Sequence, residues 1–94
     1  MELSIPINLK QRGTMTFEER NSRIVLLLSD ILDLPVASIS KEFDSSKTDS
    51  WDSLAHVKIL FALEQEFSVR FETDEISVML SLAGIHAILD EKGS

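Results

Sequence analysis

The sequence of 94 residues contains no cysteine, and it has only two prolines and three glycines. Without cysteine, a disulfide framework, a thiolate metal site and a thiol nucleophile are all excluded. Long hydrophobic runs are also missing, since a run such as Ile24 to Leu28 is too short to cross a bilayer and no secretory signal pattern precedes it. We therefore expect a soluble cytoplasmic protein without a membrane span, whose fold depends on apolar packing.

Basic residues are scarce: nine Lys and Arg stand against 16 Asp and Glu, which gives a formal net charge of −7. This balance disfavours nucleic acids and anionic membranes as partners, because both require a basic patch. It favours partners with basic surfaces, or it serves only to keep the protein in solution. A chain this short supports one modest core and rarely a deep active site, so we expect a monomer that is not an enzyme.

The chain divides into a short arm and one folded domain. Residues 1–15 have no clear hydrophobic period and are predicted to form a flexible N-terminal arm, to which we assign no function. Residues 16–94 form the predicted domain, without internal repeats.

The first helical pattern begins at Thr16, which with Glu19 forms a capping box. Apolar residues then recur at helical spacing: Phe17, Ile24, Leu27, Leu28, Ile31 and Leu32. We expect this helix to end near Leu34, because Pro35 follows. A long polar connection reaches from Pro35 to Asp52, and its apolar members Val36, Ile39 and Phe43 are predicted to pin it to the core; such long loops are often functional.

Three further helices follow the loop. The second begins at Ser53 and ends near Ser68, with a predicted core stripe of Leu54, Val57, Leu60, Phe61 and Phe67, widened by Ile59 and Leu63. A short third helix is expected from Thr73 to about Met79, and a last one from Ser81 to near Gly93. The prediction is an all-α four-helix bundle with a long loop between helices 1 and 2 and a short helix 3.

Ser53 is the most informative residue, because it lies at the start of the second helix and the end of the long polar loop. We expect it at the N-cap, where its hydroxyl lies near unpaired backbone N–H groups and the positive end of the helix dipole. This environment suits an attached phosphate ester. The alternative is an ordinary capping serine.

The two histidines do not suggest further chemistry. His56 and His86 lie on different predicted helices without the spacing of metal ligands, so we predict exposed or boundary side chains and no metal site. Ser53 and His56 could suggest a nucleophile and its base, but no orienting acid or oxyanion hole is indicated, and we predict no catalytic residue.

The segment Thr48 to Val57 resembles the attachment motif of acyl carrier proteins, which Asp52, Ser53 and Leu54 match as Asp-Ser-Leu. Two flanking segments extend the resemblance over about residues 17 to 90: Ala62-Leu63-Glu64 with Phe67 downstream, and Ile31 to Pro35 with Val36 and Ile39 upstream. The resemblance implies a carrier whose Ser53 hydroxyl receives 4′-phosphopantetheine from coenzyme A. The thiol of that arm would hold acyl-type intermediates as thioesters and present them to partner enzymes.

The implied partners are a phosphopantetheinyl transferase, an acyl-loading ligase or synthase, and acyl-transfer enzymes. In this interpretation Asp52 presents negative charge to the transferase, and Leu54 is either an apolar contact beside Ser53 or a core residue. Phe61 is more consistent with the core than with a contact to an acyl chain. Trp51 either contacts a partner or the arm, or folds onto the loop.

The sequence also departs from housekeeping fatty-acid carriers. Ser50 and Trp51 occupy the place of a usual glycine, and Ala55, His56 and Lys58 stand where carboxylates are common. We therefore expect a specialised lipid or secondary-metabolite pathway. Two alternatives stay open: a peptidyl or aryl carrier domain of a nonribosomal-type pathway, and an acidic helical interaction module without a prosthetic group.

Overall fold

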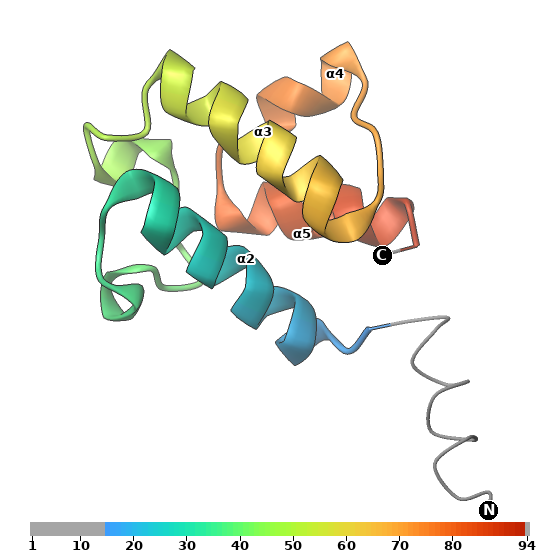
Figure 1. Cartoon of the computed structure of the whole chain (residues 1–94), viewed down its shortest axis with the longest axis horizontal. Helices are drawn as coiled ribbons and strands as arrows, with labels where there is room; N and C mark the ends of the chain where they lie inside the picture. The colour runs from blue at the N-terminus through green and yellow to red at the C-terminus, as the bar shows by residue number, and fades with distance from the viewer. Residues whose placement is uncertain (1–14, 94) are drawn as a thin grey trace, which may run out of the picture.

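The computed structural model describes residues 15–93, which form four α-helices joined by loops and short 3₁₀ turns (Figure 1). The helices are α2 (Phe17–Leu32), α3 (Ser53–Phe67), α4 (Thr73–Ile76) and α5 (Leu82–Glu91). The 3₁₀ turns are η1 (Val36–Ser38), η2 (Ser45–Lys47) and η3 (Ser77–Met79). The predicted all-α bundle, with its long loop and short third helix, is confirmed. Residues 1–14 of the predicted arm lie outside the described residues.

Helix α2 begins as its sequence predicts. The backbone N–H of Glu19 donates to the Thr16 hydroxyl at 3.1 Å, and the N–H of Thr16 donates to the Glu19 carboxylate at 3.0 Å. The helix ends at Leu32, two residues before the predicted end, because Asp33 adopts the left-handed conformation with φ 58°. The N–H of Leu34 then donates to the carbonyl of Ser29 at 3.1 Å, which closes the helix end.

Helix α3 buries only part of the predicted stripe: Ile59, Leu63 and Phe67 are in the core as predicted. Its buried residues are Ala55, Ile59, Leu63 and Phe67. Leu54, Val57 and Phe61, which we predicted in the core stripe, are exposed to solvent. The helix carries two apolar arcs, and packing against the other helices selects the arc of Ile59 and Leu63. The prediction of Phe61 as a core residue is therefore wrong.

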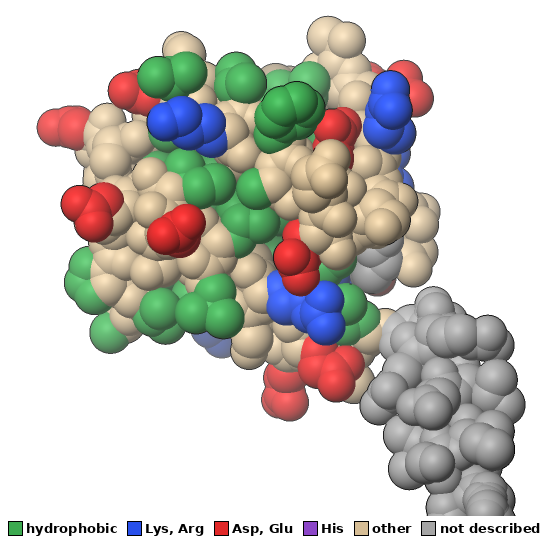
Figure 2. Space-filling view, viewed as in Figure 1, with side chains coloured by type: hydrophobic (Ala, Val, Ile, Leu, Met, Phe, Trp, Pro, Cys, Tyr) green, Lys and Arg blue, Asp and Glu red, His purple; other side chains and the backbone are tan. Residues whose placement is uncertain are grey.

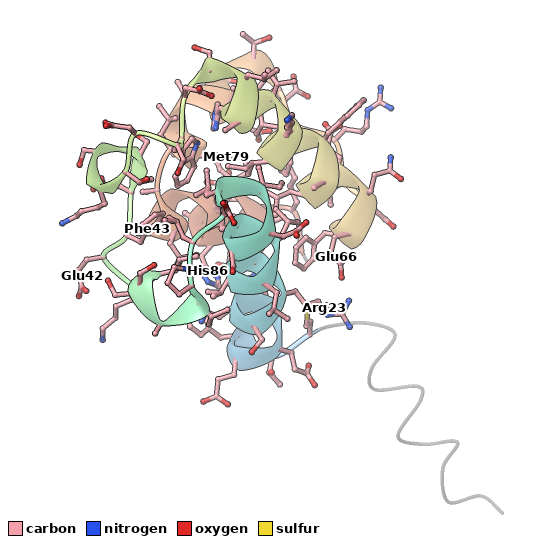
Figure 3. The ribbon with its side chains drawn as sticks, turned by 60° about the vertical axis from the view of Figure 1, so that its left-hand side comes forward. Arg23, Glu42, Phe43, Glu66, Met79 and His86 are labelled. Atoms are coloured by element: carbon pink, nitrogen blue, oxygen red, sulfur yellow. The ribbon has the colours of Figure 1, made fainter. Side chains whose placement is uncertain are left out.

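One core joins the long helices. The side chains that are at most 2% exposed come from α2, α3, η3 and α5: Ile24, Leu28, Leu32, Ile59, Leu63, Met79, Leu82, Ile85 and Leu89. Helices α2 and α3 also meet at the surface, where Arg23 Nη1 lies 3.0 Å from Glu66 Oε2 (Figure 3). No helix within the described range is long and apolar enough to cross a membrane.

The long loop is fastened to the beginning of α5. The N–H of Ser45 donates to the carbonyl of Leu80 and the N–H of Leu82 donates to that of Phe43, both at 2.9 Å. Ile39 and Phe43 are buried as predicted, whereas Val36 is 48% exposed and does not pin the loop. The loop that precedes α3 is therefore held at several points along its length.

Gly84 of α5 allows η3 to approach the helix closely. A Cβ atom at this position would lie 2.0 Å from the carbonyl oxygen of Val78. The Ser81 hydroxyl caps the helix by accepting a hydrogen bond of 2.9 Å from the N–H of Gly84. The predicted start of the last helix at Ser81 is thus confirmed.

His86 of α5 is buried against α2, so the prediction of an exposed or boundary side chain is wrong for it (Figure 3). Arg20 Nε donates to His86 Nδ1 at 3.0 Å, and Nε2 lies 2.8 Å from Asn21 Oδ1. The Phe17 ring stacks on the imidazole with 4.3 Å between ring centres. Burial first, and the Arg20 guanidinium second, lower the pKa of His86 below its usual value.

Candidate functional site

Ser53 is the first residue of α3 and not its N-cap, which corrects our prediction. Asp52 holds the N-cap position, and its carboxylate accepts a hydrogen bond of 2.9 Å from the N–H of Ala55. The first intrahelical bond runs from the N–H of His56 to the carbonyl of Asp52, also at 2.9 Å. Both Asp and Ser are good capping residues, so composition alone did not decide which of the two neighbours would cap the helix.

This arrangement leaves the Ser53 side chain available. The residue is exposed, and no group within residues 15–93 hydrogen-bonds to its hydroxyl. The first N–H groups of a helix have no intrahelical partner, and Asp52 satisfies that of Ala55. The N–H groups of Ser53 and Leu54 therefore remain at the positive end of the α3 dipole, where they favour an anionic group.

Trp51 folds onto the loop, the second of the two roles that we considered for it. Its side chain is 5% exposed and stacks on Phe43 with 6.0 Å between ring centres. The indole Nε1–H donates to His56 Nδ1 at 3.1 Å. Trp51 therefore fixes the backbone two residues before Ser53.

His56 is half-buried, and both of its ring nitrogens are engaged. Nδ1 accepts from Trp51, and Nε2 lies 3.0 Å from the carbonyl oxygen of Ile76. Neither nitrogen is left to accept a proton from Ser53, so the structure does not assemble a nucleophile and base. Within residues 15–93 there is also no cluster of three or more potential metal ligands.

The apolar row, which we define as Leu54, Val57 and Phe61, lies along the exposed side of α3. These side chains are 64%, 59% and 68% exposed, and Figure 2 shows hydrophobic side chains at the surface over this helix. The exposure of Leu54 excludes the core position that we considered for it. The sequence did not identify this row as a surface, because apolar residues at this helical spacing are equally suitable for a buried stripe.

In the loop before the site, hydrogen bonds favour the ionised form of the Asp44 carboxylate. Its carboxylate accepts hydrogen bonds from the hydroxyl and the backbone N–H of Ser46. These two bonds lower the pKa of Asp44 below its usual value. The exposed Asp49 and Asp52 follow, so the surface that leads to Ser53 is acidic.

No protein-family model matches the sequence. A curated relative does: the sequence is 35% identical over 66 residues to the polyketide-8 synthase acyl carrier protein 2 of Streptomyces avermitilis, and the match covers 70% of this chain and 76% of the relative. The chain belongs to the acyl carrier protein family. A match of 66 residues within 94 necessarily spans residues 29–66 and thus includes Ser53. As a member of a carrier family, the protein is not an enzyme.

Proposed function

We propose that this carrier bears 4′-phosphopantetheine on Ser53 and presents acyl-type intermediates of a polyketide pathway to partner enzymes. The observation that carries the proposal is the exposed, unbonded Ser53 hydroxyl at the first residue of α3. The name of the relative supports the choice of pathway. We also propose that the carrier works in the cytoplasm, the compartment that we expect from its sequence.

The residues around Ser53 suit a phosphate ester. Asp52 holds the helix start by capping Ala55, and its negative charge beside the hydroxyl is available to the transferase. The unpaired N–H groups of Ser53 and Leu54 offer donors to ester oxygens. When attached, the arm supplies a thiol that carries the acyl group as a thioester, which explains why a chain without cysteine suffices.

The apolar row is the proposed contact surface for partner enzymes, namely the transferase, the acyl-loading ligase or synthase, and the acyl-transfer enzymes. It begins beside Ser53 and extends along α3, so a partner that reaches Ser53 meets it. Lys58 is the exposed charge between Val57 and Phe61. A partner surface that is apolar and not strongly basic therefore suits this helix.

Intact mass spectrometry tests the attachment site. The purified chain is incubated with coenzyme A and a broad-specificity phosphopantetheinyl transferase, beside a control carrier. We expect one phosphopantetheine on the wild type, none on Ser53→Ala and one on Ser50→Ala, a matched variant at a nearby exposed serine. If the control carrier is modified and the wild type is not, the proposal fails and an interaction module without a prosthetic group becomes the better interpretation.

Loading the modified carrier tests the pathway. A polyketide acyltransferase with its acyl-coenzyme A substrate, and an adenylating enzyme with an amino or aryl acid, are offered separately. We expect a thioester only with the acyltransferase. Selective loading by the adenylating enzyme would instead indicate a peptidyl or aryl carrier.

A further inference from the structure

We propose that His56 is a positioning residue that couples α4 to the loop presenting Ser53, through a clasp made of Trp51, His56 and the carbonyl of Ile76. The inference rests on the proposed attachment of phosphopantetheine to Ser53. It assigns to His56 a role in the transfer reaction although its ring does not contact the reacting atoms.

The two hydrogen bonds of the clasp fix the state of the imidazole. An indole nitrogen only donates, so Nδ1 of His56 accepts from Trp51 at 3.1 Å. A carbonyl oxygen only accepts, so Nε2 carries the proton and donates to Ile76 at 3.0 Å. The ring is therefore neutral, in one tautomer, with both nitrogens paired.

The clasp connects elements that are distant in the sequence. Ile76 ends α4, twenty residues after His56. On the other side, Trp51 stacks on Phe43, whose carbonyl accepts from the N–H of Leu82 at the start of α5. A continuous set of contacts thus runs from α5 through the loop and α3 to α4.

Ser53 lies between the two residues that the clasp joins. Trp51 precedes it by two residues and His56 follows it by three, and their side chains are bonded to each other. The backbone of residues 51–56 is therefore closed into a short bridged segment. Since Ser53 and its N-cap Asp52 lie inside this segment, a shift of α4 at Ile76 would be transmitted to the hydroxyl.

Two substitutions separate positioning from simple stabilisation. His56→Leu removes both hydrogen bonds while keeping a side chain of similar size. His56→Gln retains one amide donor and one amide acceptor and is the rescue variant. The control is Ile88→Val, a small truncation in the core of α5 that weakens the fold without altering the clasp.

The experiment measures kcat and KM for transfer of phosphopantetheine from coenzyme A to the full chain, at a temperature where circular dichroism shows every variant folded. Hydrogen exchange of the Trp51 indole N–H, the single tryptophan signal, reports the clasp directly. For His56→Leu we expect fast indole exchange and a loss of kcat/KM on the order of tenfold, mainly in kcat, because the hydroxyl is no longer held in place. His56→Gln is expected to recover most of this loss, and Ile88→Val to show none.

Three outcomes would overturn the inference: kcat/KM unchanged in His56→Leu, an equal loss in Ile88→Val, or no recovery in His56→Gln when its indole exchange is slow. A wild-type chain that accepts no phosphopantetheine would instead contradict the proposed function, so the two failures can be distinguished.

Discussion

Asp52 and Ser53 divide two tasks at the start of α3. The carboxylate of Asp52 caps the helix, and the hydroxyl of Ser53 stays exposed and unbonded. Had Ser53 been the cap, its hydroxyl would be occupied by a backbone N–H and any modification would disturb the helix. With the cap on Asp52, the neighbouring hydroxyl can change chemically without loss of the helix start.

This division predicts different effects on stability for two neighbouring substitutions. Asp52→Ala is expected to lower the free energy of unfolding by about 1 kcal/mol, because the N–H of Ala55 loses its partner. Ser53→Ala is expected to change it by less than about 0.5 kcal/mol while abolishing modification. Urea unfolding of both variants checks this, and a larger loss for Ser53→Ala would show that Ser53 is mainly structural.

Gly84 gives a second prediction at the residue scale. Alanine in place of a helical glycine usually stabilises, but here the added Cβ would meet the Val78 carbonyl at 2.0 Å. We expect Gly84→Ala to lower the free energy of unfolding by about 1 to 3 kcal/mol, because η3 must move away from α5. Thermal unfolding measures the effect, and a stabilised variant would contradict the close approach.

At the scale of the element, α3 has two apolar faces, one buried and one exposed. The face of Ile59 and Leu63 joins the core, and the apolar row of Leu54, Val57 and Phe61 faces solvent. An exposed apolar surface on a helix that begins at the proposed attachment residue is typical of a protein contact. If the row is the partner surface that we propose, this carrier needs no carboxylates along the first turns of the helix to bind its partners.

Two phenylalanines on this helix allow the buried and the exposed faces to be compared by mutation. Phe61 is 68% exposed and Phe67 is 8% exposed. Phe61→Ala is expected to change the free energy of unfolding by less than about 0.5 kcal/mol, and to raise the KM of partner enzymes for the carrier. Phe67→Ala is expected to cost about 3 to 5 kcal/mol. Equal stability losses in chemical denaturation would show that Phe61 is part of the core.

At the scale of the whole molecule, the contact between α2 and α5 contains a neutral histidine. Arg20, Asn21 and Phe17 surround His86, and Arg20 also lies 3.8 Å from Asp90. A proton on Nδ1 would replace the acceptor of the Arg20 hydrogen bond and place two positive charges together. Protonation of His86 therefore opposes the packing of these two helices.

The free energy of unfolding should consequently fall in acid in two stages. The imidazole of His86 titrates at about pH 6.5 in the unfolded chain and at a lower pH in the folded chain. Below about pH 6.5 the unfolded chain therefore binds more protons than the folded chain, and the free energy of unfolding falls. A second loss should follow below about pH 4, where Asp44 and Glu75, with pKa values lowered in the folded state mainly by hydrogen bonds from Ser46 and Glu72, become protonated. Urea unfolding from pH 7.5 to 3.5 measures both stages. His86→Gln should remove only the first, and an unchanged profile would contradict this role of His86.

Local sequence signals determined the helices of this protein. The capping box of Thr16 and Glu19 and the serine before the last helix act through neighbouring backbone groups, so they can be recognised without the fold. The proline after the first helix marked its end only to within two residues, because the left-handed Asp33 ends it earlier. The Asp-Ser-Leu motif likewise indicated the carrier family and the candidate residue Ser53. These features depend on residues that are close together in the chain.

Only the tertiary structure decided which surfaces became buried. The spacing of Leu54, Val57 and Phe61 suits a core stripe as well as a docking surface, and the packing of Ile59 and Leu63 against the other helices settled the choice. His86 gave no local signal of burial, because its partners Arg20 and Asn21 are more than sixty residues away. The clasp of Trp51, His56 and Ile76 likewise could not be predicted from the sequence, since hydrogen bonds between distant elements form only when the helices have packed.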